Sequence, residues 1–196
     1  MPVIEITVLI FAYLLGSISS AIIICKLMGM ADPREVGSHN PGATNVLRIG
    51  GRKAAILTFA FDVLKGVIPV LVAKYFDFSI LWLSGVVAAT FLGHCLPIFF
   101  SFQGGKGVAT AFGALTTMNW QIGLVILIVW VIVFMLFRIS SLAGISSASA
   151  IPIATWYFSV ESVLPMTIMA LLMIWRHQDN IKGLLSGDEQ RLGGSD

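Results

Sequence analysis

The residues Gly37–Arg48, which we call the polar loop, combine the groups that bind an anion, within a chain that is otherwise strongly apolar. The run brings together hydroxyls, amides, small residues and one arginine. Its centre, Asn40–Ala43, predicts a tight turn in which Pro41 presets one central dihedral and Gly42 supplies a positive φ at the other. Backbone N–H groups, hydroxyls and a guanidinium together suit an anion such as phosphate. The alternative is an ordinary loop between two membrane spans.

A second polar cluster, Gln103–Thr110, contains three glycines around Lys106. It is not a phosphate-binding P-loop, because Phe100 stands where the first glycine is required and Gly107 replaces the serine or threonine. A lysine at a helix N-terminus opposes the helix dipole unless an anion lies between them. Consecutive glycines also let the backbone approach such an anion. The alternative is a flexible turn with a lysine that snorkels to the interface.

A third cluster, Arg176–Asn180, follows the last apolar run. His177 and Asn180 are three residues apart and share a helix face. Both can hydrogen-bond the hydroxyls of a small polar substrate, and His177 can instead shuttle a proton. The competing interpretation of His177 is a solvated helix end. Arg138 and Ser141 form a smaller fourth polar site, where an arginine is ordinarily a membrane anchor.

Charged residues also occur inside an apolar run, at Asp62 and Lys65. They are three residues apart, and charges at membrane depth are costly unless they are paired. We therefore expect a structural ion pair rather than a catalytic one, with a possible role in orienting the polar loop. His94, close to Pro97, is expected to be a hydrogen-bonded packing residue rather than a base.

Composition indicates which elements must position these clusters. Of the 196 residues, 57% are hydrophobic and 11% are charged, and the mean hydropathy is +0.93, as in polytopic membrane proteins. A crossing helix needs about 20 residues, so we expect an all-α bundle of seven transmembrane helices in one domain over residues 1–196. The short fourth run must extend into the glycines before it or remain partly embedded. The apolar runs are Val3–Cys25, Ala54–Val72, Ile80–Phe99, Val108–Met118, Ile122–Phe137, Leu142–Phe158 and Val163–Trp175.

Basic residues predict the orientation of this bundle. With the N-terminus outside and the C-terminus in the cytoplasm, only Lys74 lies outside and Lys65 lies within a span, as the positive-inside rule requires. The acidic residues Glu5, Asp77 and Glu161 then mark the outer ends. The cations that fall on the cytoplasmic side are Lys26, Arg34, Arg48, Arg52, Lys53, Lys106, Arg138, Arg176, Lys182 and Arg191.

Several function classes find no support in the sequence. A net charge of +2 gives no indication of nucleic-acid binding. The three histidines and two cysteines have no ligand spacing that would predict a metal site. No cofactor is expected, and no obligate protein partner is evident. The absence of an internal repeat gives no support to an inverted-repeat transporter.

These clusters, in this order, resemble the small membrane glycerol-3-phosphate acyltransferases that use acyl phosphate as donor, the PlsY family. The similarity covers essentially the whole chain. It implies a seven-helix enzyme of the bacterial inner membrane that makes lysophosphatidic acid for phospholipid synthesis, with its active site facing the cytoplasm. The motifs that carry it are Gly16-Ser17-Ile18, Gly37–Arg48, Asp62 with Lys65-Gly66, Gly93-His94, Gly104–Thr110, Arg138 with Ser141, and His177 with Asn180.

The resemblance also implies a set of site residues. Arg48 and Lys106 are expected to bind phosphate and stabilise charge, the groups around Ser38 to hold acyl phosphate, and those around His177 to orient glycerol 3-phosphate. The implied catalytic residues are Ser38, Arg48, Lys106 and His177. The implied substrate-binding residues are Asn40, Gly42, Thr44, Asn45, Gly104, Gly105, Ser141 and Asn180.

Two positions depart from the family pattern. His39 stands where glycine is common, although histidine tolerates left-handed backbone better than most residues. Gly183 stands where arginine is common, so one expected cation of the third cluster is missing.

The chemistry implied by the resemblance needs no acyl-enzyme. The residue five positions after each histidine is not acidic, so the His-x4-Asp pair of other glycerolipid acyltransferases is absent. Direct attack by the substrate hydroxyl, with the departing phosphate accepting its proton, needs the fewest catalytic groups. The competing hypothesis is a transporter or channel for an organic phosphate, which would need polar groups along a whole crossing. A purely structural membrane protein would leave the three clusters unexplained.

Overall fold

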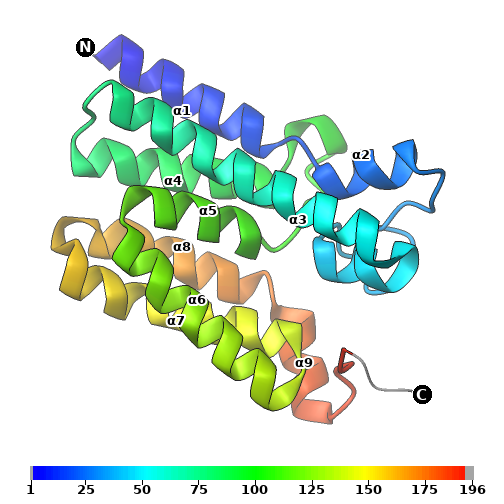
Figure 1. Ribbon diagram of the computed structural model, residues 1–196. Helices are drawn as coiled ribbons and strands as arrows, with labels where there is room; N and C mark the ends of the chain where they lie inside the picture. The colour runs from blue at the N-terminus through cyan, green and yellow to red at the C-terminus, as the bar shows by residue number, and fades with distance from the viewer. Residues whose placement is uncertain (1, 193–196) are drawn as a thin grey trace. The chain divides into compact units, whose positions relative to one another are not determined.

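The computed structural model describes residues 2–192, and that part of the chain is helical, without a strand (Figure 1). Contacts divide the chain into two compact units, Met1–Met118 and Asn119–Asp196. The first unit contains α1 (Pro2–Gly16), α2 (Ser20–Leu27), α3 (Ala43–Tyr75), α4 (Ile80–Cys95), the 3₁₀ turn η1 (Ile98–Phe100) and α5 (Val108–Met118). The second contains α6 (Trp120–Phe137), α7 (Ser140–Phe158), the 3₁₀ turn η2 (Val160–Ser162), α8 (Val163–Trp175) and α9 (Gln178–Ser186).

Three helical stretches among the described residues are long and apolar enough to cross a membrane: α3, α4 with η1, and α6. The bent pair of α1 and α2 makes a fourth if it is one span. The shorter apolar helices are α5 and the segment Val160–Trp175. Helix α5 begins at Val108 and does not extend into the preceding glycines, so the first of the two expected possibilities is wrong and partial embedding stays a prediction. The expected total of seven spans therefore stays a prediction.

The expectation of one continuous helix over Val3–Cys25 is wrong. The helix stops at Gly16 and restarts at Ser20, and the two parts differ in direction by 41°. The reason is a contact distant in sequence: the Lys65 ammonium donates to the Ile18 carbonyl at 2.8 Å. The Ile18 carbonyl thus accepts a hydrogen bond from a buried side chain in place of a helix N–H, so the helix can break there without leaving this carbonyl unsatisfied.

Glycines allow two pairs of helices in the first unit to touch backbone to backbone. A Cβ at Gly16 of α1 or at Gly93 of α4 would collide with a carbonyl of the facing helix, and the same holds for Gly66 of α3 and Gly113 of α5. Small residues at helix interfaces in membranes serve this close approach. Three of these glycines belong to the motifs that carry the family resemblance, and their role is packing.

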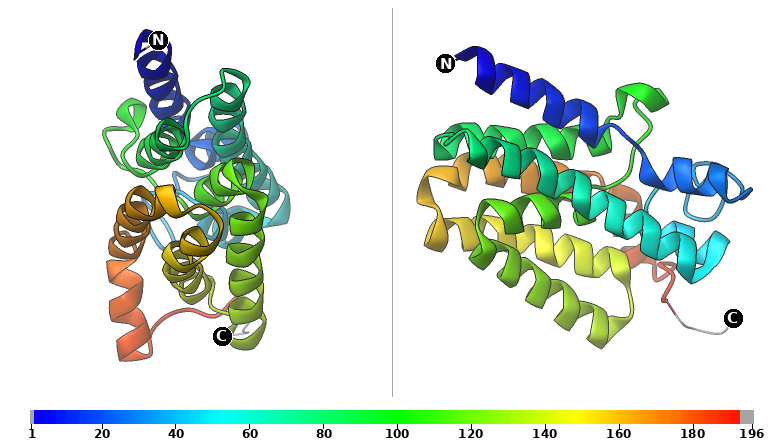
Figure 2. Two further views of the ribbon diagram at one scale, coloured as in Figure 1. Left: turned by 90° about the vertical axis from the view of Figure 1, so that its left-hand side faces the viewer. Right: turned by 45° about the horizontal axis from the view of Figure 1, so that its top comes forward.

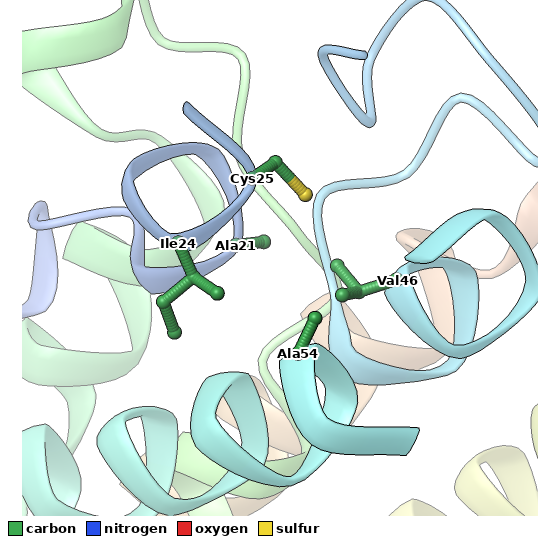
Figure 3. Packing of buried hydrophobic residues seen from close by; sticks show 5 residues of the cluster. All are labelled: Ala21, Ile24, Cys25, Val46 and Ala54. Atoms are coloured by element: carbon green, nitrogen blue, oxygen red, sulfur yellow. The ribbon is translucent and has the colours of Figure 1, made fainter. Parts of the chain in front are cut away.

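Helix α3 is kinked at Gly51, whose φ of 78° and ψ of −177° are not helical. The kink separates a short first segment, Ala43–Gly50, from the long apolar part. Figure 3 shows how α2 packs on both parts at once. The contacting residues are Ala21, Ile24 and Cys25 of α2, with Val46 before the kink and Ala54 after it. The first segment is therefore fixed by apolar packing on its inner face.

In the second unit, α6 packs on α7 and α7 packs on α8 (Figure 2). The side-chain oxygen of Asn119 caps α6 by accepting from the Gln121 N–H at 2.9 Å. Arg138 ends α6 in the left-handed conformation, φ 59°. The short connection after it brings Ser141 into the first turn of α7.

Candidate active site

Asn45, in the first turn of α3, holds the polar loop in place. Its side-chain oxygen accepts from the Ser38 N–H at 2.9 Å. Its amide nitrogen donates to the carbonyls of Pro33, at 2.8 Å, and Val36, at 3.0 Å. The side chain is 1% exposed, and both amide hydrogens have backbone acceptors. This geometry fits a residue that positions Ser38 better than one that contacts substrate.

Asn45→Asp is expected to loosen this loop. The aspartate keeps the acceptor for Ser38 but loses both donors. The Val36 carbonyl still accepts the His39 N–H at 3.2 Å, so the main cost is the Pro33 carbonyl, and a carbonyl left unsatisfied costs about 1–3 kcal/mol. The unfolding midpoint of the purified protein in detergent should fall, and acyl transfer with it. Asn119→Asp is the matched control, because aspartate keeps the helix cap and the donor that it loses serves the Phe158 carbonyl at an exposed position, 3.1 Å away. Equal midpoints for the parent and Asn45→Asp would contradict the role given to Asn45.

The expected positive φ at Gly42 is wrong. Gly42 has an extended backbone, with φ −147° and ψ 163°, and is the N-cap of α3. Its N–H donates to the Asn40 carbonyl at 2.9 Å, which closes a three-residue turn around Pro41. The left-handed residues of the loop are instead Gly37, φ 65°, and His39, φ 55°. The helix start imposes this, because an N-cap residue takes extended backbone angles.

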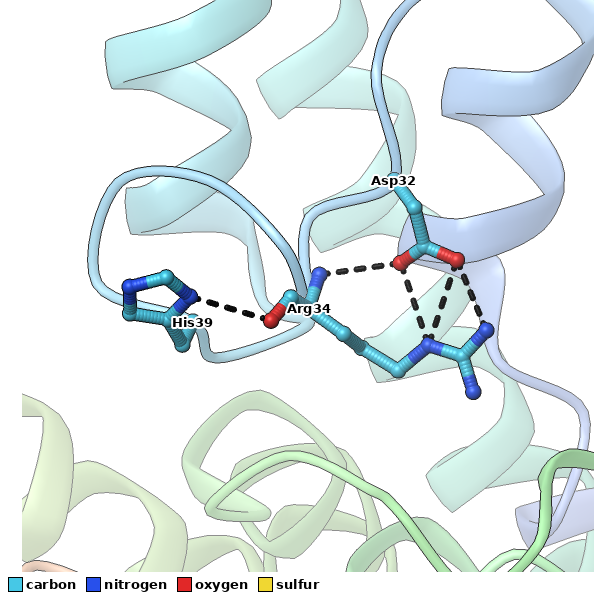
Figure 4. Close-up of polar contacts among 3 residues, drawn as sticks. All are labelled: Asp32, Arg34 and His39. Carbon is cyan, nitrogen blue, oxygen red and sulfur yellow. Dashed lines mark hydrogen bonds and ion pairs between the residues drawn. The ribbon is translucent and has the colours of Figure 1, made fainter.

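Asp32 and Arg34, which precede the polar loop, form hydrogen bonds with each other, and Arg34 also forms one with His39 (Figure 4). Arg34 donates to both carboxylate oxygens of Asp32, the shortest contact being 2.7 Å. These hydrogen bonds hold the pKa of Asp32 below its usual value. His39 Nδ1 lies 3.1 Å from the Arg34 carbonyl, and since a carbonyl only accepts, Nδ1 carries the hydrogen. The imidazole thus makes a contact that a glycine at this position cannot make.

His39→Gly should change stability little. Glycine relieves a left-handed conformation that costs about 1–2 kcal/mol, while the lost hydrogen bond is worth about 1 kcal/mol and glycine adds freedom to the unfolded chain. His39→Ala loses the bond but keeps the strained backbone, so it should be less stable by about 1 kcal/mol. Unfolding midpoints of the two variants test this. An alanine variant as stable as the parent would show that the imidazole contact contributes nothing.

Arg48 lies on the short first segment of α3 and is partly buried. It makes no hydrogen bond or ion pair to any residue in the described range 2–192, in contrast to Arg34. Thr44 and Ser38 belong to the same stretch of chain, Ser38 exposed and Thr44 partly buried. A partly buried guanidinium without a protein anion is a group available to an anionic ligand.

The second cluster begins in the loop between η1 and α5. We call residues 103–107 the glycine loop. Gly104 and Gly105 are buried, Lys106 is partly buried, and Gly107 has a φ of 80°. The loop folds back on the end of α4, where the Gly105 N–H donates to the His94 carbonyl at 3.2 Å. Lys106 therefore stands two residues before the start of α5, as the sequence predicted.

This loop also touches the polar loop. A Cβ at Gly105 would lie 3.0 Å from the Pro41 carbonyl oxygen, so the two backbones are in contact there. The structure thus brings the first two predicted clusters together within the first unit.

The predicted ion pair between Asp62 and Lys65 is confirmed, with 2.8 Å between Oδ1 and Nζ. Both residues are buried. Ser20 donates to the same Asp62 oxygen at 2.6 Å. His94 is also buried, with Nδ1 3.0 Å from Thr110 Oγ1, which confirms it as a hydrogen-bonded packing residue.

His177 joins α8 to α9 in the second unit and is 3% exposed, so it is not a solvated helix end. Its Nδ1 lies 2.8 Å from the Met173 carbonyl. Nδ1 must carry the hydrogen in that contact, so in the neutral ring Nε2 is the basic nitrogen.

Ser141 and Asn180 converge on a residue to which the sequence assigned no role, Glu189. Its Oε1 accepts from Ser141 Oγ at 2.5 Å and from Asn180 Nδ2 at 2.7 Å. The chain reaches this point by reversing at Gly187, φ 83°, after α9 ends. Gly187 was the one sequence signal for the chain reversal after α9. The contact itself could not be predicted, because 48 residues separate Ser141 from Glu189 and local sequence patterns do not indicate such distant pairs.

The glycine at position 183 fits this arrangement. A Cβ there would lie 3.0 Å from Glu189 Oε2, so the carboxylate rests against the bare backbone. The Gly183 carbonyl also accepts the Asp188 N–H at 2.8 Å. The described part of the chain, residues 2–192, places Glu189 against Ser141, Asn180 and this backbone.

Comparison with known proteins agrees with an enzyme that handles a phosphate-bearing substrate at a membrane. The family model described as glycerol-3-phosphate acyltransferase matches residues 6–187. The chain therefore belongs to the glycerol-3-phosphate acyltransferase family.

Among its relatives, the glycerol-3-phosphate acyltransferase of Actinobacillus succinogenes is 51% identical over 183 residues, covering 93% of this chain and 92% of the relative. The enzyme of the same name from Haemophilus influenzae is 48% identical over 184 residues, covering 94% of this chain and 92% of the relative. These bacterial relatives place the chain among the acyltransferases of phospholipid synthesis.

Two crystal structures of the integral membrane glycerol 3-phosphate acyltransferase PlsY (YgiH) are similar to the model. The glycerol 3-phosphate form has a TM-score of 0.91 at 41% identity and covers 96% of each chain. The lysophosphatidic acid form has a TM-score of 0.88 at 39% identity, covering 96% of this chain and 95% of the other. The protein is accordingly an integral membrane acyltransferase.

Proposed function

We propose that this protein transfers a fatty acyl group from acyl phosphate to glycerol 3-phosphate, releasing lysophosphatidic acid and phosphate. The observation that carries the proposal is Arg48, a partly buried cation with no protein anion in the described chain, on the polar loop that contacts the glycine loop holding Lys106. Acyl phosphate is a mixed anhydride that carries a phosphate on an apolar chain. Two adjacent cationic loops on apolar helices suit that donor.

The proposed roles are those that the family resemblance implies. Arg48 and Lys106 bind phosphate and stabilise the charge of the transition state. Ser38 and Thr44, with the backbone around Gly42, Gly104 and Gly105, hold the acyl-phosphate group. Asn40 belongs to the same turn, and Asn45 fixes the loop through its backbone contacts.

Glycerol 3-phosphate is assigned to the second unit. Ser141 and Asn180, each held by a hydrogen bond to Glu189, would hydrogen-bond it through their remaining polar atoms and hydrogens. His177 would orient its hydroxyl or accept a proton at Nε2. In the crystal structure of a similar protein the ligand is glycerol 3-phosphate, which supports this acceptor.

The reaction proceeds by direct attack. The acceptor hydroxyl oxygen forms a bond to the acyl carbonyl carbon, and the bond from that carbon to the phosphate oxygen breaks. The departing phosphate takes the hydroxyl proton, so charge and atoms balance without an acyl-enzyme. Positioning of the two substrates and stabilisation of the developing phosphate charge supply the rate.

The proposed setting is the bacterial inner membrane, with seven spans, the N-terminus outside and the polar clusters on the cytoplasmic side. The bias of basic residues supports this orientation. An organic-phosphate transporter is the weaker alternative, because it would need polar groups along a whole crossing, and the buried charges Asp62 and Lys65 are paired with each other.

The decisive experiment incubates the purified protein in lipid or detergent with palmitoyl phosphate, with and without glycerol 3-phosphate. Phosphate release should depend on the acceptor and match the lysophosphatidic acid formed. Release at the same rate without acceptor would refute the transferase proposal. Uptake of glycerol 3-phosphate into sealed vesicles without acylation would favour the transporter.

Asn180→Ala should raise the KM for glycerol 3-phosphate more than it lowers kcat. The substitution removes an amide assigned to the acceptor, and a binding group used equally in the ground and transition states affects KM. Asp179→Asn is the neighbouring control. Asp179 is exposed, and its ion pair with the exposed Lys182, at 3.4 Å, is a surface contact that contributes little. An unchanged KM would remove Asn180 from the acceptor site.

A further inference from the structure

His94 is a buried imidazole that the proposed chemistry does not use. Its Nδ1 lies 3.0 Å from Thr110 Oγ1 and 3.5 Å from Asp62 Oδ1. Asp62 is itself fixed by Lys65 at 2.8 Å and Ser20 at 2.6 Å. Every one of these five side chains is less than 10% exposed. The ring is therefore held by polar groups of α3 and α5, and the group from α3, Asp62, is itself held by Ser20 of α2.

The opposite edge of the ring faces the glycine loop. A Cβ at Gly105 would collide with His94 Nε2, so the imidazole rests on the bare backbone of that glycine. The Pro41 carbonyl closes the other side of the same glycine, and the Gly105 N–H donates to the His94 carbonyl at 3.2 Å. Gly105 is thus enclosed between the histidine and the polar loop.

We propose that His94 is a positioning residue for the glycine loop: held by Asp62 and Thr110, its ring sets where Gly105 meets Pro41 and thereby where Lys106 stands. Lys106 follows Gly105 directly, so a shift of the backbone moves its ammonium. The inference deepens the proposed function, on which its kinetic consequence rests. The effect on the loop itself can be measured without any activity.

The first test is hydrogen–deuterium exchange of the peptide that spans the glycine loop, in the full-length protein in detergent. In His94→Asn the shorter amide can reach Thr110 but not Gly105, and exchange in the loop should speed on the order of tenfold, as for the loss of about one stabilising contact. His94→Gln reaches further and should stay close to the parent. Exchange in His94→Asn equal to the parent would overturn the proposal.

A control on the same helix separates positioning from general loosening. Thr90 is buried one turn earlier, and within residues 2–192 its hydroxyl donates to the Val86 carbonyl alone, at 2.8 Å. Thr90→Val should leave loop exchange unchanged. If it speeds exchange as much as His94→Asn does, the effect belongs to α4 as a whole and the proposal falls.

The contact between ring and glycine gives a coupled test. Gly105→Ala should disturb the loop, because its methyl group meets the imidazole. In the His94→Asn background the collision with the imidazole is removed and the 3.0 Å contact with the Pro41 carbonyl oxygen remains, so the double variant should show less additional exchange than the sum of the two single changes. Strict additivity would show that the ring does not set the loop.

Kinetics with palmitoyl phosphate and glycerol 3-phosphate complete the test. His94→Asn should lower kcat on the order of tenfold or more, because small displacements of catalytic groups are costly, and His94→Gln should recover most of it at an equal unfolding midpoint. If glutamine recovers nothing, the positioning role is wrong. If the parent itself transfers no acyl group, the proposed function fails, while the exchange experiment still decides the role of His94.

Discussion

Arg48→Ala is expected to reduce acyl transfer close to zero while leaving the protein folded. The guanidinium makes no hydrogen bond or ion pair with residues 2–192, so its removal leaves no protein group unsatisfied. The segment that carries it is held by Val46 and the apolar packing of α2. Loss of a charge stabiliser in the transition state typically lowers kcat by about 100- to 1000-fold. Initial rates and the unfolding midpoint of the same preparation measure both effects.

Two further variants sharpen this prediction. Arg52→Ala removes an exposed cation just after the kink and should leave activity near normal. Arg48→Lys keeps the charge without the planar fork, and should recover only part of the rate, since a lysine cannot bind a phosphate bidentately. Near-normal activity in Arg48→Ala would make this arginine a topological anchor alone.

Lys106→Met is expected to lower kcat by roughly 100-fold or more with an unchanged unfolding midpoint. The substitution keeps most of the apolar stem and deletes the charge at the start of α5. Lys106→Arg keeps the charge in a broader group and should retain partial activity if charge dominates. The assay is the same acyl transfer, with both substrates varied.

Lys53 provides the matched control for this pair. It is exposed on α3, so Lys53→Met changes the net charge equally without touching either loop. If the Met and Arg variants of Lys106 both behave like the parent, the lysine only snorkels to the interface, and the glycine loop is not an anion site.

Interactions that are close in sequence were predictable. Asp62 and Lys65 are one helical turn apart, and the cost of burying either charge alone predicts their pairing. The polar clusters were recognisable because hydroxyls, glycines and cations stand out against an apolar background. The loop before Val108 lies where the sequence indicated.

Interactions between distant segments were not predictable from local pattern. The break in the first apolar run depends on Lys65, 47 residues beyond the Ile18 carbonyl. The backbone of Gly42 follows from its place as a helix cap, although the dipeptide Pro-Gly indicated a turn with positive φ. From the sequence, the amide of Asn45 could equally bind a ligand. Its structural role appears only in the fold, where it donates to the carbonyls of Pro33 and Val36.

The glycine contacts between α1 and α4, and between α3 and α5, bear on how the first unit responds to its lipid surroundings. With backbone against backbone there is no layer of flexible side chains to shear, so partners cannot slide along each other to match a thicker or thinner bilayer. Hydrophobic mismatch must then be met by tilting each pair as one rod, or by deforming the lipid around it. A leucine at Gly66 or Gly93 would force the two backbones apart, because even its Cβ would collide with a carbonyl of the facing helix, and the two helices would no longer tilt as one rod.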